Sequence, residues 1–145
     1  MARTSSDIVI DATPSQIMAV IADFAAYPQW ATGVRKADVV EESGGRPAVV
    51  HMELDAAPIR DEYDLRYTWD DDRSVTWTID KPGAMLTGMD GSYDLEPVSD
   101  GTRVTYQLAV SVSIPMLGML KRKAEKVVID AALKGLKRRV EEPRG

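Results

Sequence analysis

Apolar side chains recur with helical spacing along the last stretch of the chain, from Pro115 to about Glu141. Pro115 suits the first turn of a helix, where its missing N–H costs nothing, and Ser113 is a suitable cap. One apolar strip contains Leu117, Leu120, Ala124, Val127, Val128, Ala131 and Gly135. A second strip beside it contains Ile129, Leu133, Leu136 and Val140. We expect a helix about 40 Å long that lies across a large apolar surface.

A second helical pattern follows a short strand near the start of the chain. The β-branched run Ser6–Asp11 predicts the strand. Thr13 and Gln16 form a capping-box pattern around Pro14, which sits at the first helical position. The apolar residues that follow at helical spacing are Ile17, Val20, Ile21 and Phe24. Ala25–Trp30 then indicates a second short helix or turn, and the two together would form a V that holds the end of the long helix.

Between these helices apolar and polar positions alternate, which is typical of half-buried strands. Six strands are predicted, covering Arg35–Glu42, Ala48–Leu54, Glu62–Trp69, Ser74–Asp80, Ala84–Glu96 and Arg103–Ser113. The first of the six is polar and edge-like, and the fifth contains Gly88 and Gly91, which indicate a bulge or bend. With Ser6–Asp11 they predict an α+β fold: a curled, seven-stranded antiparallel sheet whose concave face is covered by the long helix. Residues 1–145 are expected to form one domain.

The composition excludes several kinds of site. The 145 residues include no cysteine and one histidine, which excludes disulfides, thiolate sites and multi-histidine metal centres. We expect no metal and no redox cofactor. No apolar run approaches the length of a membrane span, and the first residues lack a secretory pattern, so a cytoplasmic location is expected. The chain shows no GxSxG elbow, no phosphate-binding glycine loop and no dinucleotide fingerprint.

Charge is distributed unevenly along the chain. Residues 115–145 carry 9 Lys+Arg and 4 Asp+Glu, whereas residues 1–114 carry 9 and 19. The acidic body argues against nucleic acid as a partner. The basic helix face suits an anionic membrane surface or an acidic partner, and the alternative interpretation is a solvated face beside an acidic sheet. A monomer and a dimer are both compatible with the sequence.

The order of elements and several short motifs resemble one known family. The motif residues lie in four stretches: 10–20, 23–30 (Asp-Phe-Ala-Ala-Tyr-Pro-Gln-Trp), 91–95 (Gly-Ser-Tyr-Asp-Leu) and 101–104 (Gly-Thr-Arg-Val). With the terminal amphipathic helix, they resemble the helix-grip fold of the START/birch-pollen-allergen-like superfamily (SRPBCC). Within that superfamily the chain looks most like the bacterial polyketide cyclase/dehydrase and lipid-transport family. The resemblance implies a cavity between the sheet and the long helix that holds a hydrophobic ligand.

The residues expected to line that cavity come from the inward positions of the strands and from the long helix. They are Met52, Leu54, Tyr63, Leu65, Tyr67, Trp69, Trp77, Ile79, Thr87, Met89, Tyr93, Tyr106, Leu108, Leu120, Ala124, Val127 and Ala131. Small helix residues leave room, and aromatic side chains with polar tips can orient a mostly apolar ligand. The alternative is that these side chains simply fill the core.

No catalytic residue emerges from the sequence. His51 is the natural candidate for a general base, but strand parity places it opposite Val50 and Met52, on the solvent face. Glu53, Glu62, Asp64 and Arg66 fall on that face too, while Arg60 is near enough to a strand start to reach a cavity mouth. The family motif is matched by Asp23, Tyr27 and Trp30. These residues either lie near the cavity entrance or serve packing and turn formation. We interpret the three adjacent aspartates Asp70, Asp71 and Asp72 as a solvated turn.

Three functions therefore stay open at this point. The first is binding or transport of a hydrophobic small molecule such as a lipid or polyketide. The second is a cyclase/dehydrase-type enzyme that uses Tyr63, Tyr67, Tyr93 or Tyr106 as hydrogen-bond donors or acids. Cyclase cavities of the family include arginines, and the predicted inner face has none. The third is an interaction protein that uses the basic face of the terminal helix, formed by Lys123, Lys126, Lys134 and Lys137.

Overall fold

The computed structural model describes residues 3–31, 33–56, 59–113 and 118–142. Its helices are α1 (Pro14–Ala22), the 3₁₀ turn η1 (Phe24–Ala26), α2 (Tyr27–Trp30) and α3 (Gly118–Glu141). Its strands are β1 (Thr4–Ile10), β2 (Val34–Ser43), β3 (Arg46–Ala56), β4 (Ile59–Asp70), β5 (Ser74–Lys81), β6 (Leu86–Val98) and β7 (Gly101–Val112). Within this part of the chain no helix is long and apolar enough to cross a bilayer.

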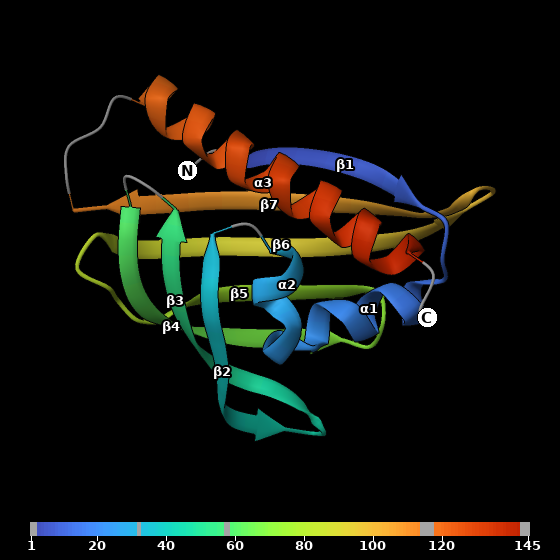
Figure 1. The fold of residues 1–145 in the computed structure, drawn as a ribbon, viewed down its shortest axis with the longest axis horizontal. Helices are drawn as coiled ribbons and strands as arrows, with labels where there is room; N and C mark the ends of the chain where they lie inside the picture. The colour runs from blue at the N-terminus through green and yellow to red at the C-terminus, as the bar shows by residue number, and fades with distance from the viewer. Residues whose placement is uncertain (1–2, 32, 57–58, 114–117, 143–145) are drawn as a thin grey trace.

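The strands form one antiparallel sheet in the order β1-β7-β6-β5-β4-β3-β2. The predicted seven-stranded sheet is therefore confirmed, and the polar strand β2 lies at an edge as expected. Figure 1 shows that the sheet is strongly curved, with β2 and β3 bent around one end, and that α1, α2 and α3 all lie on the same side of it. The first strand pairs with the last, since Ile10 of β1 is opposite Thr102 of β7.

The start of α1 follows the predicted capping box. Thr13 Oγ1 accepts a hydrogen bond from Gln16 N at 3.2 Å, and Gln16 Oε1 accepts one from Thr13 N at 2.9 Å. Pro14 occupies the first turn. These contacts satisfy backbone donors that a helix start leaves without partners. The helix then buries Ile17, Met18, Val20 and Ile21.

Strand β6 contains the predicted irregularity, and it changes which side chains point inward. The register with β7 shifts between Leu86 and Gly88. A bulge adds one residue to one strand, so side chains on its two sides change faces. Leu86 is buried and Thr87 is exposed. The prediction that Thr87 faces inward was wrong for this reason.

The long terminal helix is present, but it turns a different strip toward the sheet. α3 lies over β1 and β7 and meets α1 and α2. Its buried apolar residues are Ile129, Leu133 and Leu136 from the second strip. Ala124, Val127 and Val128 of the first strip are exposed, so the prediction that Ala124 and Val127 face the sheet was wrong. The predicted helix start at Pro115 lies outside the described residues.

A buried carboxylate explains why α3 is turned this way. Glu125 is 3% exposed and accepts hydrogen bonds from Thr4 Oγ1 at 2.6 Å and from Val110 N at 2.8 Å. The pairing of β1 with β7 ends at Thr4 and Leu108, so Val110 lies beyond its end. Glu125 thus satisfies a ladder donor that β1 does not reach. Once Glu125 points at β7, Ala124 and Val127 point away from it.

Candidate functional site

The inward side chains of β4, β5, β6 and β7 form a row of aromatic rings. Ring centroids are 5.5 Å apart for Tyr67 and Trp77, 5.4 Å for Trp77 and Tyr93, and 4.6 Å for Tyr93 and Tyr106. The register places Tyr67 opposite Trp77 and Tyr93 opposite Tyr106. Trp77 lies over Gly91, where a β-carbon would overlap the indole ring. A glycine at position 91 therefore makes room for the centre of the row.

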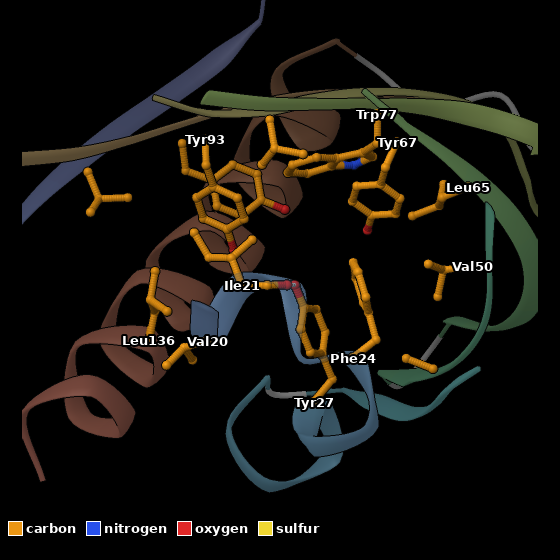
Figure 2. Packing of buried hydrophobic residues seen from close by; sticks show 14 of the residues in the cluster. Val20, Ile21, Phe24, Tyr27, Val50, Leu65, Tyr67, Trp77, Tyr93 and Leu136 are labelled. Atoms are coloured by element: carbon orange, nitrogen blue, oxygen red, sulfur yellow. Dashed lines mark hydrogen bonds between the residues drawn. The ribbon is translucent and has the colours of Figure 1, made fainter. Parts of the chain in front are cut away.

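The short helices face this row from the other side. The Phe24 ring lies 4.9 Å from that of Tyr67 and 4.6 Å from that of Tyr27. Figure 2 shows Phe24 and Tyr27 pointing from the helices toward Tyr67 and Trp77 on the sheet. The Tyr27 hydroxyl donates to the carbonyl of Ile21 at 2.5 Å. The result is an aromatic interior between the sheet and the α1–α2 segment.

Four tyrosine hydroxyls in this interior have no hydrogen-bond partner among the described residues: those of Tyr63, Tyr67, Tyr93 and Tyr106. Their side chains are buried. In the described part of the chain, the only fully enclosed side-chain nitrogen or oxygen without a partner is Trp30 Nε1. Buried polar groups are normally hydrogen-bonded, so these hydroxyls are available to a guest.

Burial also keeps these phenols neutral. Desolvation raises the pKa of Tyr67 and Tyr93 well above the usual value, and neighbouring tyrosines raise it further. The pKa values of Tyr63 and Tyr106 are raised by the same main cause. A neutral phenol donates a hydrogen bond through its O–H. The interior therefore offers donors without offering charge.

Most of the predicted lining residues lie in or beside this interior. Met52, Tyr63, Leu65, Tyr67, Trp77, Tyr93, Tyr106 and Leu108 are buried in one cluster. Leu54, Trp69, Ile79 and Met89 are partly buried and pack against it. Ala131 is half-buried, whereas Thr87, Ala124 and Val127 are exposed and do not face the interior. The side chain of Leu120 lies outside the described part of the chain. Contact of any of these residues with a ligand stays a prediction.

A surface hollow of about 670 Å³ reaches the end of the aromatic row. Tyr67 and Trp69 line it together with residues of the β2–β3 and β4–β5 turns. The Arg46 guanidinium lies 5.2 Å from the Trp69 ring centroid and pairs with Asp72 at 2.6 Å. Tyr67 belongs both to this hollow and to the buried row. Sequence reasoning had not singled out Arg46, because nothing local distinguishes it from other turn residues.

The family-motif residues near α2 have packing roles in this structure. Tyr27 and Trp30 are buried, with ring centroids 4.7 Å apart, whereas Asp23 is exposed. Gly135 of α3 approaches the Trp30 carbonyl so closely that a β-carbon would overlap it. Trp30 therefore marks the point where α3 meets α2.

The charged candidates lie outside the aromatic interior. Arg60 is exposed and pairs with Asp55 at 3.1 Å, beside a second hollow of about 520 Å³. Arg66 pairs with Asp80 at 3.1 Å. The predicted aspartate turn is confirmed: its carboxylates diverge, and Asp70 pairs with Arg73 at 3.0 Å while Asp72 binds Arg46. These ion pairs are partly to largely solvent-exposed.

His51 lies on the outer face of the sheet, as strand parity predicted. Its Nδ1 is 2.6 Å from Asp64 Oδ1 and its Nε2 is 3.4 Å from Glu62 Oε1. The hydrogen bond to Asp64 raises the pKa of His51, and burial opposes it in part. The sequence alone does not indicate that these side chains meet, because their contact depends on the β3–β4 register, which sets His51 opposite Asp64.

Comparisons with known proteins agree with this geometry. A family model described as polyketide cyclase / dehydrase and lipid transport matches residues 1–141. A START superfamily protein from Mycobacterium smegmatis superposes with a TM-score of 0.88 at 20% identity, covering 96% of this chain and 97% of that one. A protein from Thermus thermophilus gives 0.80 at 23% identity, with the same coverage. The Zhui aromatase/cyclase from a Streptomyces species gives 0.71 at 16%, covering 97% and 96%. A search of curated proteins found no match.

Proposed function

Because the chain belongs to the polyketide cyclase/dehydrase and lipid transport family, we propose that it binds a hydrophobic small molecule in its aromatic interior. The START-like fold supports a role in binding hydrophobic ligands. What we add is the place where this chain holds its ligand and the class of that ligand. The ligand class we propose is a lipid, a polyketide or a similar mostly apolar molecule. It would lie between the sheet and the helices, against the predicted lining residues.

One observation carries this proposal: four buried tyrosine hydroxyls for which the described residues offer no hydrogen-bond partner. A core that only filled space would use phenylalanine, since an unpartnered buried hydroxyl costs free energy. Apolar walls with a few convergent polar groups are the usual composition of a small-molecule site. The hydroxyls of Tyr67, Tyr93 and Tyr106 suit a ligand that carries carbonyl or hydroxyl oxygens at spaced positions along an apolar body.

We place the way in at the hollow beside Tyr67 and Trp69. Tyr67 belongs to both the hollow and the buried row, so a ligand that passes Trp69 reaches the interior directly. Arg46 covers the Trp69 ring from outside.

The test separates hydroxyls that have no partner from one that has. Tyr67→Phe and Tyr106→Phe each remove a hydroxyl for which the described residues offer no partner, so the free energy of unfolding should stay the same or rise, while affinity for an oxygen-bearing ligand falls about fivefold or more. Tyr27→Phe is the matched control, because it removes the hydrogen bond to Ile21 and should cost about 1 kcal/mol of stability. Affinity would be measured with a fluorescent fatty acid and by its displacement with flat aromatic ketones.

Native mass spectrometry of protein purified from its own host supplies the ligand itself. A stoichiometric hydrophobic passenger supports the proposal and identifies a compound class. Protein that carries nothing and takes up neither a fluorescent fatty acid nor a flat aromatic compound would contradict it.

The expected domain extent of 1–145 and the cytoplasmic location stay predictions.

The neutral phenols also favour a second candidate function, a cyclase/dehydrase-type reaction. A phenol that donates to a ligand carbonyl polarises it, and a closely bound chain is held in a reactive conformer. The two functions differ in one measurement. In an enzyme, one of the Tyr→Phe variants would abolish turnover of a bound polyketide-like chain while its affinity changed little; in a carrier, ligand leaves unchanged.

The exposed side of α3 is the third candidate region. Met119, Val127 and Val128 are exposed there, close to the exposed Lys123 and Lys134. Lys126 and Lys137, by contrast, pair with Asp130 at 3.0 Å and Glu141 at 2.7 Å. We propose that this side of α3 makes peripheral contact with an anionic membrane or acidic partner. Cosedimentation with anionic vesicles, lost in Lys123→Glu with Lys134→Glu, would test it.

A further inference from the structure

The outer face of β3 and β4 carries a compact group of ionisable side chains. Two cross-strand pairs make it up: His51 is opposite Asp64, and Glu53 is opposite Glu62. All four side chains point to the same face because positions two apart along a strand share a face. They lie on the far side of the sheet from the aromatic interior, so the proposed ligand site does not use them.

His51 is held in the way that metal-binding histidines are held. Its Nδ1 is 2.6 Å from the Asp64 carboxylate, and Asp64 is 9% exposed. A carboxylate that accepts the Nδ1–H proton fixes the neutral tautomer and leaves the Nε2 lone pair free to ligate. Nε2 is directed toward Glu62, whose Oε1 is 3.4 Å away. The second nitrogen thus faces a further ligand type at short range.

The Glu53–Glu62 pair is unfavourable by itself. Like charges directly opposite each other in a sheet repel. The nearest cation to Glu53 is Lys36, whose Nζ is 3.9 Å from Oε2 but 3.2 Å from Asp38. Lys36 therefore lies closer to Asp38 than to Glu53. A divalent cation between the two glutamates would relieve the repulsion.

We propose that His51, Glu53 and Glu62 bind a divalent transition-metal ion of the Zn²⁺ type, with Asp64 as the positioning residue for His51. One ligand atom from each of the three side chains lies within 4.8 Å of the others. Zinc binds imidazole nitrogen and carboxylate oxygen at about 2.0–2.2 Å, so small side-chain rotations bring the three donors to one ion. Mixed nitrogen and oxygen donors favour Zn²⁺ over Mg²⁺ or Ca²⁺. Three protein ligands leave a fourth position for water.

This assignment departs from the expectation of no metal, which rested on the number of histidines. One histidine excludes a multi-histidine centre, but it does not exclude a site with two carboxylates. The competing interpretation is an ion-pair cluster in which protonated His51 itself compensates the glutamates. The two interpretations predict different results when zinc is added.

Zinc titration of untagged protein by calorimetry, at mildly alkaline pH, distinguishes them. We expect one Zn²⁺ per chain and a higher melting temperature with zinc than without. His51→Asn and Glu62→Gln should each weaken binding by about tenfold or more. Both side chains are partly or largely exposed, so both variants should fold; Glu62→Gln should raise the apo melting temperature because it removes the like-charge pair. Asp64→Asn should weaken binding while leaving the number of ligands unchanged.

The matched control is Glu96→Gln, an exposed glutamate of β6 that pairs with Arg103. It should bind zinc as the parent protein does. Cobalt substitution adds a spectroscopic readout, since a four-coordinate Co²⁺ site with nitrogen and oxygen ligands has strong visible absorption bands that His51→Asn would remove. Zinc binding with equal affinity in His51→Asn and the parent, or no stoichiometric binding at all, would overturn the proposal in favour of the ion-pair cluster.

Discussion

The two halves of α3 differ in how they are held to the rest of the molecule. The C-terminal half buries Ile129, Leu133 and Leu136 against the core. The N-terminal half exposes Met119 at 75% and Val127 at 63%, and the buried one among its described side chains is Glu125. Among the described side chains, the C-terminal half thus combines apolar packing with hydrogen bonds such as that from Lys137 Nζ to the Val9 carbonyl, whereas the N-terminal half is held by hydrogen bonds.

One helix can thus combine two differently held parts. We call residues 129–141 of α3 the anchor and residues 118–128, which are held more weakly, the arm. Regions with few buried apolar contacts open locally at lower free energy than the core does. The N-terminal half of α3 is the part where such opening is expected, because Met119, Val127 and Val128 are exposed there. A ligand or membrane that contacts α3 would therefore act on this half first.

The largest expected effect is at the anchor. Leu136→Ala removes a fully buried side chain and leaves a cavity, so unfolding should become easier by about 2–5 kcal/mol. Urea denaturation followed by circular dichroism measures it. An exposed alanine substitution in the same half, Lys134→Ala, should change stability by less than about 0.5 kcal/mol. Equal effects of the two would mean that the C-terminal half is not the anchor.

A smaller effect is expected where the arm is held. Glu125→Gln keeps the shape of the side chain but weakens its hydrogen bonds to Thr4 and Val110 by removing the charge, which should cost about 1–3 kcal/mol. Amide hydrogen exchange should then speed up before residue 128 and not after it. Glu142→Gln, at an exposed position, is the control. Uniform acceleration along all of α3 would contradict the distinction between the halves.

The contribution of Glu141, at the C-terminal end of α3, to the free energy of unfolding should decrease at low pH. The Glu141 carboxylate accepts from Asp11 N at 2.9 Å and from Lys137 Nζ at 2.7 Å, and these contacts lower its pKa below the usual value, with the backbone bond to Asp11 first. A carboxylate whose pKa is lower in the folded state than in the unfolded state stabilises the fold at pH values above its unfolded-state pKa. This stabilisation is lost as the pH falls through its folded-state pKa. The effect should be modest because the group is largely solvated. Unfolding at stepwise lower pH should show a smaller acid loss in Glu141→Gln than in the parent.

The smallest effect is expected on the exposed strip of the arm. Val127→Ser should change the free energy of unfolding by less than about 0.5 kcal/mol, because the side chain is already in water. Affinity for anionic vesicles should fall in the same variant if this strip contacts a membrane. A stability loss above about 1 kcal/mol would show that another surface covers Val127, and the arm would then not be free.

Much of the fold could be predicted from local signals. The capping box at Thr13 and Gln16 and the alternation along β4 depend on residues a few positions apart, and the structure confirms both. The interior positions Tyr67 and Trp77 followed from the same alternation. The prediction failed at Thr87, where a bulge reversed the parity, and at Val127, where two apolar strips competed for the same sheet.

What the sequence by itself determined is the set of elements and the inward face of each regular strand, since periodicity and capping are properties of neighbouring residues. The tertiary structure alone decided which strip of α3 is buried, because Glu125 finds its donors on β1 and β7, more than a dozen residues away in the chain. It alone brought His51 to Asp64 and Glu62, because only strand pairing sets positions 51, 62 and 64 side by side. Contacts between distant segments depend on register, and register is a property of the assembled sheet.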